Sequence, residues 1–264
     1  MKKYLASILI ANYNNAKFLD RSIQSCLNQS YKNLEILIHD DRSSDKSLSV
    51  LKKYKNKSIK FFQNKSKKSG ISAIDAKNSY YKLIKIAKGH IIFLLDSDDY
   101  FKKNKVYEVI KIFKKKDKID FIQNLPLLKS ANGIKKKKNK NNILSFWPYL
   151  APESCISFRR KFIDKFIKKN LVIEKKYNNV WLGFRLGIFA YFITKSFYSL
   201  NKNLTVYESH GESKKYNFLG YNWFIRRFNS YRYLNKISKN KIIFNYRIDY
   251  LVTKFIYSIL KVIK

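Results

Sequence analysis

The sequence predicts an α/β protein built on a doubly wound, mostly parallel sheet. Apolar runs of strand length alternate with stretches of helical periodicity between residues 5 and 99. Polar or acidic clusters follow several of these strands directly, at the sheet edge where such folds bind their ligands. With 264 residues and 45% hydrophobic content, the chain is long and apolar enough to build a substantial core.

The spacing of apolar residues gives the order of the elements in the first half of the chain. Leu19, Ile23 and Cys26 recur at helical spacing, whereas the runs before and after them are continuous and of strand length. We therefore expect strand 5–11, helix 17–29, strand 34–39, a helix ending near 54, strand 59–63, a helix between Gly70 and Gly89, strand 91–95, helix 103–115 and strand 119–123.

The pattern is weaker in the second half. A lysine-rich stretch at 133–142 predicts a solvated loop. Beyond it we expect a strand at 155–158, helices at 160–168 and 180–193, and a short strand at 204–207. The tail from Tyr221 onward is helix-like, basic and aromatic, so we expect one domain over residues 1–215 and a basic amphipathic helical extension over 216–264.

The net charge of +38 makes a nucleic-acid-binding protein the obvious rival interpretation. The lysines, however, are scattered over every polar segment and form no reading motif, a usage typical of AT-rich genomes. We therefore expect no nucleic-acid partner. The charge still predicts affinity for anionic surfaces, including phospholipid head groups.

The cysteines and the hydropathy of the chain indicate the cellular compartment of the protein. Cys26 and Cys155 stand far apart among apolar residues, as buried thiols in a reducing compartment do. No apolar run approaches the roughly 18 to 20 residues that span a bilayer. We expect a cytoplasmic protein. The apolar stripe at 251–263 fits either packed core or a helix lying on a membrane surface.

The segment 90–99 carries the clearest chemical signal. An apolar strand ends in Asp96, Asp98 and Asp99, and crowded carboxylates repel one another unless a cation or hydrogen-bond donors neutralise them. Residues two apart in an extended chain point to the same side, so Asp96 and Asp98 can face one ligand while Asp99 turns away. The cluster predicts a divalent metal beside a phosphate-bearing ligand.

Three segments in this order, 7–14, 40–45 and 89–99, resemble the family 2 glycosyltransferases of the GT-A fold. The resemblance implies sugar transfer from a nucleotide-diphospho-sugar, usually with inversion, and we expect a UDP-sugar. It implies a donor site formed by Ala11 and Tyr13 after the first strand, with Tyr13 stacking, and by Asp41, which contacts the base. Asp96 would hold ribose or metal, and Asp98 would be the leading ligand of Mg²⁺ or Mn²⁺.

The resemblance is weaker for the remaining functional residues. His210 falls where many relatives carry a histidine that reaches the metal or diphosphate. Relatives place an acid pair near residue 179 as catalytic base, but Asn178 and Asn179 stand here, and asparagine cannot accept a proton. We expect Glu174 to be the base, with Glu153 as the alternative.

Arg42 and Asp45 lie in the polar loop after the second expected strand. Arg42 replaces a glycine that is usual in this family, and Asp45 is expected to cap the following helix.

The acceptor would be a cell-surface glycan or a lipid-linked molecule, with the protein peripheral on the inner face of the plasma membrane. A homologue that binds nucleotide-sugar but lacks catalysis is the alternative that Asn179 motivates.

Overall fold

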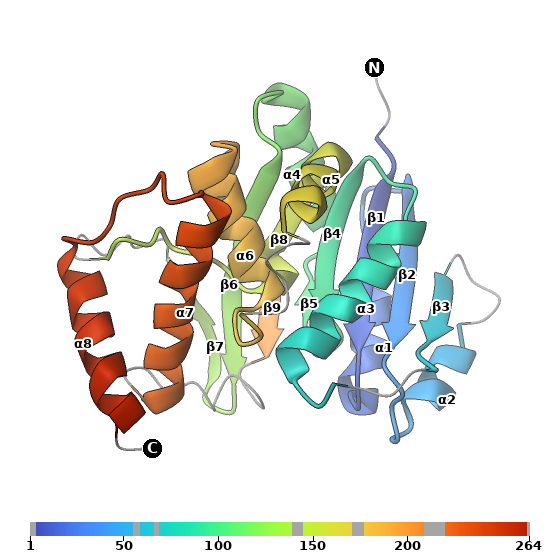
Figure 1. Ribbon diagram of the computed structural model, residues 1–264. Helices are drawn as coiled ribbons and strands as arrows, with labels where there is room; N and C mark the ends of the chain where they lie inside the picture. Colours follow the sequence, from blue (N-terminus) through green and yellow to red (C-terminus); the bar gives the residue numbers. More distant parts are fainter. Residues whose placement is uncertain are drawn as a thin grey trace.

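The structure is a computed structural model that describes residues 4–54, 59–65, 69–138, 145–170, 177–208 and 220–262. Its centre is a nine-stranded sheet of order β3-β2-β1-β4-β8-β6-β9-β5, with β7 beside β6. Helices cover both faces of this sheet (Figure 1). The predicted α/β class is confirmed.

The first half of the chain forms a parallel βαβ unit. Strand β1 lies between β2 and β4, β3 lies outside β2, and all four strands run in the same direction. The elements are β1 (Ala6–Asn12), α1 (Ala16–Leu27), β2 (Leu34–Asp40), α2 (Ser47–Lys52), β3 (Ile59–Gln63), α3 (Ser72–Ile86) and β4 (Ile91–Asp96). The predicted bounds agree closely with these, because apolar periodicity is strong throughout this region.

The second half is mixed in strand direction. Strand β8 runs antiparallel between β4 and β6, whereas β9 runs parallel to β6. The elements are β5 (Tyr100–Phe101), α4 (Lys105–Lys115), β6 (Phe121–Ser130), β7 (Gly133–Lys136), the 3₁₀ turn η1 (Glu153–Cys155), β8 (Ile156–Arg159), α5 (Arg160–Asn170), α6 (Leu182–Ile188), the π-helical turn Phe189–Ile193, β9 (Phe197–Glu208), α7 (Tyr221–Ile237) and α8 (Ile248–Val262).

Part of the segment expected to be a loop is a strand. Residues 133–136 form β7, which pairs with 127–130 of β6 in a tight hairpin. All four residues of β7 are exposed, so no apolar alternation marks the strand in the sequence, and backbone pairing alone defines it. Strands β6 and β9 are also longer than expected, because they extend beyond their apolar centres.

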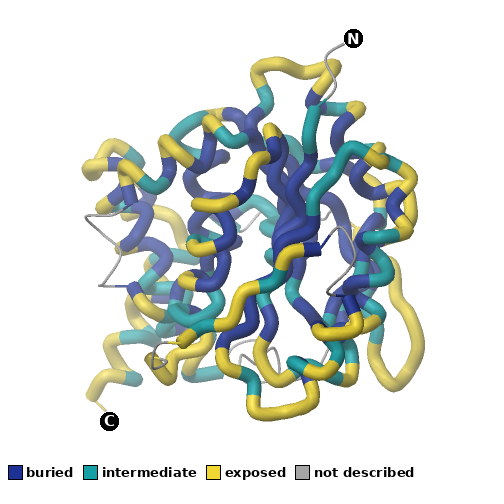
Figure 2. The backbone as a smooth tube through the Cα atoms, turned by 90° about the vertical axis from the view of Figure 1, so that its right-hand side faces the viewer, coloured by how far each residue is buried: buried dark blue, intermediate teal, exposed yellow. Residues whose placement is uncertain are grey.

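Alternating side chains of the central strands form two cores. On β1, Ile8 and Ile10 face the core covered by α1, α2 and α4, whereas Leu9 faces the core covered by α3, α5, α6 and α7. The central strands are accordingly buried along their length, and exposed residues concentrate in helices and loops (Figure 2).

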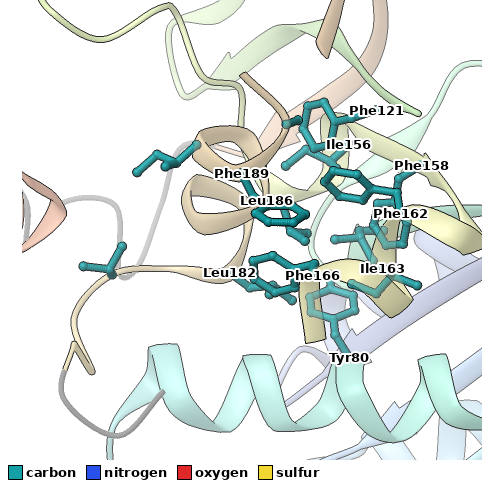
Figure 3. Close-up of a cluster of buried hydrophobic side chains, with 14 of the residues drawn as sticks. Tyr80, Phe121, Ile156, Phe158, Phe162, Ile163, Phe166, Leu182, Leu186 and Phe189 are labelled. Carbon is teal, nitrogen blue, oxygen red and sulfur yellow. The ribbon is translucent and has the colours of Figure 1, made fainter. Parts of the chain in front are cut away.

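The second of these cores is rich in aromatic rings. Phe162 of α5 contacts Phe121 of β6 and Phe189 of the π-helical turn, with ring centroids 5.7 and 5.5 Å apart. Phe158 and Phe166 extend the cluster, and Tyr80 of α3 lies at its lower edge (Figure 3). Such rings bury large apolar areas, so this cluster fixes the second half of the chain on the sheet.

The two C-terminal helices differ in their relation to the sheet. Tyr231, Tyr233 and Leu234 of α7 are fully buried in the aromatic core. Helix α8 packs on α7 and lies at the edge of the molecule (Figure 1). Among the described helices, none combines the length and apolarity needed to cross a bilayer. The division of the chain near residue 215 stays a prediction.

Candidate active site

The carboxyl ends of β1, β2 and β4 meet at one edge of the sheet. Parallel pairing sets Asn12 beside Asp40 and Ala11 beside Asp96. A cavity of about 800 Å³ lies at this edge. The residues predicted for donor binding all line it, namely Ala11, Tyr13, Asp41, Asp96 and Asp98. The structure thus brings these residues together, while their individual roles stay predictions.

The two acids after β2 have different surroundings. Asp40 is fully buried, and its Oδ1 accepts hydrogen bonds from Asn12 Nδ2 at 2.7 Å and Ser43 Oγ at 2.6 Å. Asp41 lines the cavity, and its Oδ1 accepts a hydrogen bond from Asn64 Nδ2 at 2.6 Å. Asp40 therefore fixes the loop that presents Asp41 to the cavity.

The loop after β2 also holds Arg42 and Asp45, and its geometry accounts for both residues. Arg42 has a φ of 58°, a left-handed conformation that glycine adopts without strain, which accounts for the usual glycine at this position. Asp45 accepts hydrogen bonds from the backbone N–H of Ser47 at 2.9 Å and of Ala16 at 2.8 Å. It therefore binds the first turn of α2 and the first turn of α1 together.

The acids after β4 divide as the strand geometry predicts. Asp96 and Asp98 line the cavity, and Asp96 Oδ1 accepts a hydrogen bond from Tyr80 Oη at 2.7 Å. Asp99 is buried, and its Oδ1 accepts a hydrogen bond from the backbone N–H of Glu208 at 2.8 Å. Asp99 thus holds the end of β9 against the end of β4.

The charge balance of this edge suits a divalent cation. Burial, together with the carboxylates of Glu153 and Asp98, raises the pKa of Asp96 well above its usual range. Among the described residues, no group of three or more His, Cys, Asp and Glu side chains is arranged to hold a metal. Two carboxylates beside a diphosphate do fit Mg²⁺ or Mn²⁺, because such ions take few protein ligands and bind phosphate oxygens as well. His210 lies outside the described residues.

Glu153 is the acid that the second half of the chain contributes to the cavity. It begins η1, and its Oε1 accepts a hydrogen bond from the backbone N–H of Gly183 at 2.9 Å. Burial raises its pKa above the usual range. A Cβ on Gly183 would lie 2.9 Å from Ile156 Cδ1 and 3.0 Å from Glu153 Cδ, so a larger residue here would press on both side chains. A carboxylate with a raised pKa can accept a proton near neutral pH.

The other residues considered for the base lie elsewhere. Asn179 Oδ1 accepts a hydrogen bond from Asn229 Nδ2 at 3.0 Å, and Asn179 does not line the cavity, although Val180 and Trp181 do. Glu174 lies outside the described residues. Of the residues considered for the base, Glu153, which sequence reasoning ranked second, is therefore the one that the described part of the chain places at the cavity.

An aromatic wall faces the carboxylates, and sequence reasoning missed it. The three tryptophans of the chain all line this cavity. Phe184, Tyr207 and Arg226 lie in the same lining. The wall residues come from the segment before η1, from α6, β9 and α7, so no sequence motif unites them. The rarity of tryptophan was the one signal that could have marked them.

A buried lysine supports the turn that carries Glu153. Lys105, at the start of α4, donates hydrogen bonds to the carbonyl of Ser154 and to Thr205 Oγ1, the latter at 2.9 Å. Its Nζ also lies 3.6 Å from the centre of the Phe101 ring. Burial lowers the pKa of Lys105 to about 7. The lysine therefore ties η1 and β9 together directly behind the cavity.

Comparison with known sequences assigns the family. Residues 7–193 match the sequence model described as Glycosyl transferase family 2. An uncharacterized glycosyltransferase of Nostoc sp. is 26% identical over 222 residues, which is 78% of this chain and 65% of that protein. The Escherichia coli protein WfaP, a UDP-Glc:alpha-D-GlcNAc-diphosphoundecaprenol beta-1,3-glucosyltransferase, is 38% identical over 117 residues, 44% of each chain. The matched regions thus cover less than two thirds of these relatives.

Comparison with solved structures gives the same fold. Staphylococcus aureus TarS in complex with UDP-GlcNAc matches with a TM-score of 0.61 and 16% identity, covering 97% of this chain and 71% of that one. The mannosyltransferase PcManGT from Pyrobaculum calidifontis, in complex with GDP-Man and Mn²⁺, matches with a TM-score of 0.59 and 10% identity, covering 96% and 70%. At such identities the likeness shows the fold alone. From its sequence and its GT-A fold, this chain belongs to glycosyl transferase family 2.

Proposed function

We propose that this glycosyltransferase moves a monosaccharide from a nucleotide-diphospho-sugar, most simply a UDP-sugar, to a lipid-linked or cell-surface glycan acceptor, with inversion at the sugar carbon. The observation that carries the proposal is the convergence of acids from both halves of the chain on one cavity. Asp41, Asp96 and Asp98 come from the strand ends of the first half, and Glu153 faces the same space from the second half.

The first-half side of the cavity suits a nucleotide. Tyr13 lines the cavity and is 51% exposed, and in this proposal its ring stacks on the nucleobase. Asp41 reaches the same space from the end of β2 and can accept hydrogen bonds from base or ribose donors. The S. aureus protein TarS has been solved with UDP and with UDP-GlcNAc, which supports a uridine donor here.

Asp98 and Asp96 are the groups that would hold Mg²⁺ or Mn²⁺ beside the diphosphate. A bound cation would stabilise the negative charge that develops on the leaving nucleoside diphosphate. Burial and the neighbouring carboxylates of Glu153 and Asp98 raise the pKa of Asp96, so a cation at this place would relieve the repulsion between the carboxylates. The described residues therefore suit a cation that arrives with the donor.

Glu153 is the base in this proposal. The acceptor hydroxyl oxygen forms a new bond to the sugar carbon, the bond from that carbon to the diphosphate oxygen breaks, and the hydroxyl proton passes to the Glu153 carboxylate. The hydrogen bond from Gly183 holds one carboxylate oxygen, and the other oxygen would then face the acceptor hydroxyl. Glu153 thus takes the role that the sequence resemblance assigns to an acid near residue 179.

The aromatic wall suits the acceptor. Indole rings present flat apolar faces to sugar rings, and Arg226 adds a positive charge that can pair with phosphate. The E. coli relative WfaP is named for a diphosphoundecaprenol-linked acceptor. A lipid-linked acceptor of that chemical class would fit this wall, and it would place the protein on the inner face of the plasma membrane.

A homologue that binds donor without transferring sugar is the second candidate, and Asn178 and Asn179 are the observation behind it. It predicts metal-dependent nucleotide binding without turnover of any donor. Turnover that depends on Glu153 would exclude it.

Calorimetric titration tests the donor half of the proposal. We expect UDP to bind the wild type more tightly with Mn²⁺ than without, and Asp98→Asn to remove the metal-dependent part. Asp164→Asn is the matched control, because Asp164 is exposed on α5 and does not line the cavity. Absence of binding by any nucleoside diphosphate to the wild type would refute the proposed function.

A further inference from the structure

Helix α8 presents an apolar face to solvent. Six residues form this outward face, and all are exposed: Ile248, Leu251, Val252, Phe255, Ile259 and Val262. Phe255 is 67% exposed and Val262 86% exposed. With 3.6 residues per turn, these positions fall on one side of the helix. A surface helix of a globular protein normally shows polar residues on its solvent side, so this face calls for a covering partner.

The outward face is separate from the face that packs on the protein. Thr253 is buried on the opposite side of α8, and the Tyr257 ring stacks on Phe228 of α7 with centroids 4.2 Å apart. Asp249 pairs with Arg227 of α7 at 2.8 Å. Helix α8 is therefore already anchored through its inner side, and its outward face has no packing role in the described structure. Figure 1 shows α8 at the outer edge of the molecule.

The charges around this face are almost all positive. Between residues 239 and 262 the cations are Lys239, Lys241, Arg247, Lys254 and Lys261, all exposed. The single acid of this stretch, Asp249, is directed inward to Arg227 and to the backbone N–H of Phe146 at 2.7 Å. Lys254 and Lys261, seven residues apart, flank the outward face on one side, where their ammonium groups can reach lipid phosphates while their stems lie on the apolar region.

We infer that the outward face of α8 docks on an anionic phospholipid membrane. An apolar face flanked by lysines inserts at the level of the head groups and gains from both burial and charge. A second copy of this chain fits less well, because two such faces would bring their cations together in a protein of net charge +38.

Docking through α8 also affects the cavity. Helix α7 contributes Trp223, Arg226 and Arg227 to the cavity lining, and it also packs on α8. Arg227 joins the two, because it lines the cavity and pairs with Asp249 of α8. If α8 is docked, only α7 separates the aromatic wall of the cavity from α8 and the bilayer. This second step rests on the proposed function, whereas docking itself does not.

Vesicle flotation with the full chain tests the docking. We expect the wild type to bind phosphatidylcholine vesicles that contain phosphatidylglycerol, and Phe255→Gln/Val262→Gln to lower this affinity about tenfold or more. Lys254→Gln/Lys261→Gln should lower it about thirtyfold, from about 1 kcal/mol for each lysine at an anionic surface. Tyr107→Gln/Ile134→Gln is the matched control, because both side chains are about half exposed but lie on α4 and β7.

Unchanged binding by the Phe255/Val262 variant would overturn the inference, since general basic charge would then carry the attachment. A wild-type dimer in sedimentation that this variant dissociates, without vesicle binding by either, would overturn it in favour of self-association. UDP binding in solution is measured on the same samples. Absence of vesicle binding by the wild type, with UDP binding retained, refutes docking alone. Vesicle binding by a wild type that binds no UDP refutes the proposed function alone.

Discussion

Replacing Glu153 by Gln is the sharpest test of the proposed chemistry. The amide oxygen of Gln can accept the hydrogen bond that Gly183 donates at 2.9 Å, so the turn η1 keeps its anchor. Only the capacity to take a proton is lost. We therefore expect an intact fold and an unchanged affinity for UDP, with transfer strongly reduced.

The expected loss of transfer rate in Glu153→Gln follows from the role of Glu153 as a general base. A positioned general base contributes about 10²- to 10⁴-fold to the rate, or about 2.7 to 5.4 kcal/mol of barrier. Because burial raises the pKa of Glu153, the carboxylate is a stronger base than a free one, which favours the upper part of this range. The wild-type rate should rise with pH as Glu153 loses its proton, and Glu153→Gln should lack this rise.

The assay is single-turnover transfer with donor and enzyme in excess over acceptor, followed across the pH range in which the wild type is active. Donor affinity is measured separately by titration, so that binding and chemistry are distinguished. A variant within threefold of the wild type, or a wild-type pH profile that Glu153→Gln reproduces, would refute the assignment of Glu153 as base.

Three further predictions address the surroundings of this residue. Gly183→Ala should lower turnover about 10- to 100-fold with UDP affinity unchanged, because the new Cβ would lie 3.0 Å from Glu153 Cδ and 2.9 Å from Ile156 Cδ1 and so would shift the carboxylate. Equal losses in turnover and UDP affinity would contradict this. Asn179→Asp should give no gain in transfer, since Asn179 faces Asn229 and does not line the cavity; a large gain measured in the same assay would show that the native chain lacks its base. Lys105→Met should change how stability depends on pH in urea unfolding. Burial lowers the folded pKa of Lys105 from 10.5 to about 7, so the unfolded chain holds the extra proton between these values. The wild type should therefore gain unfolding free energy relative to Lys105→Met as pH rises from about 7 toward 10, by up to about 1.4 kcal/mol per pH unit, and a constant difference would contradict a buried neutral amine.

The sequence by itself determined the first half of the protein and its part of the cavity. In a parallel βαβ unit each strand is a continuous apolar run, and ligands bind at the strand ends. Local patterns therefore place Asp41, Asp96 and Asp98 at one sheet edge. The same logic predicted that Asp99 would turn away, because the direction of a side chain after a strand is a local property.

Only the tertiary structure decided the second half of the cavity. Glu153, Trp181 and Trp223 are far apart in sequence and meet because β8, α6 and α7 pack on the aromatic core. No spacing rule links residues that contact one another through a core. For the same reason the apolar stripe of α8 was ambiguous: a sequence shows that one side of a helix is apolar, but which side faces the protein depends on what α7 already buries.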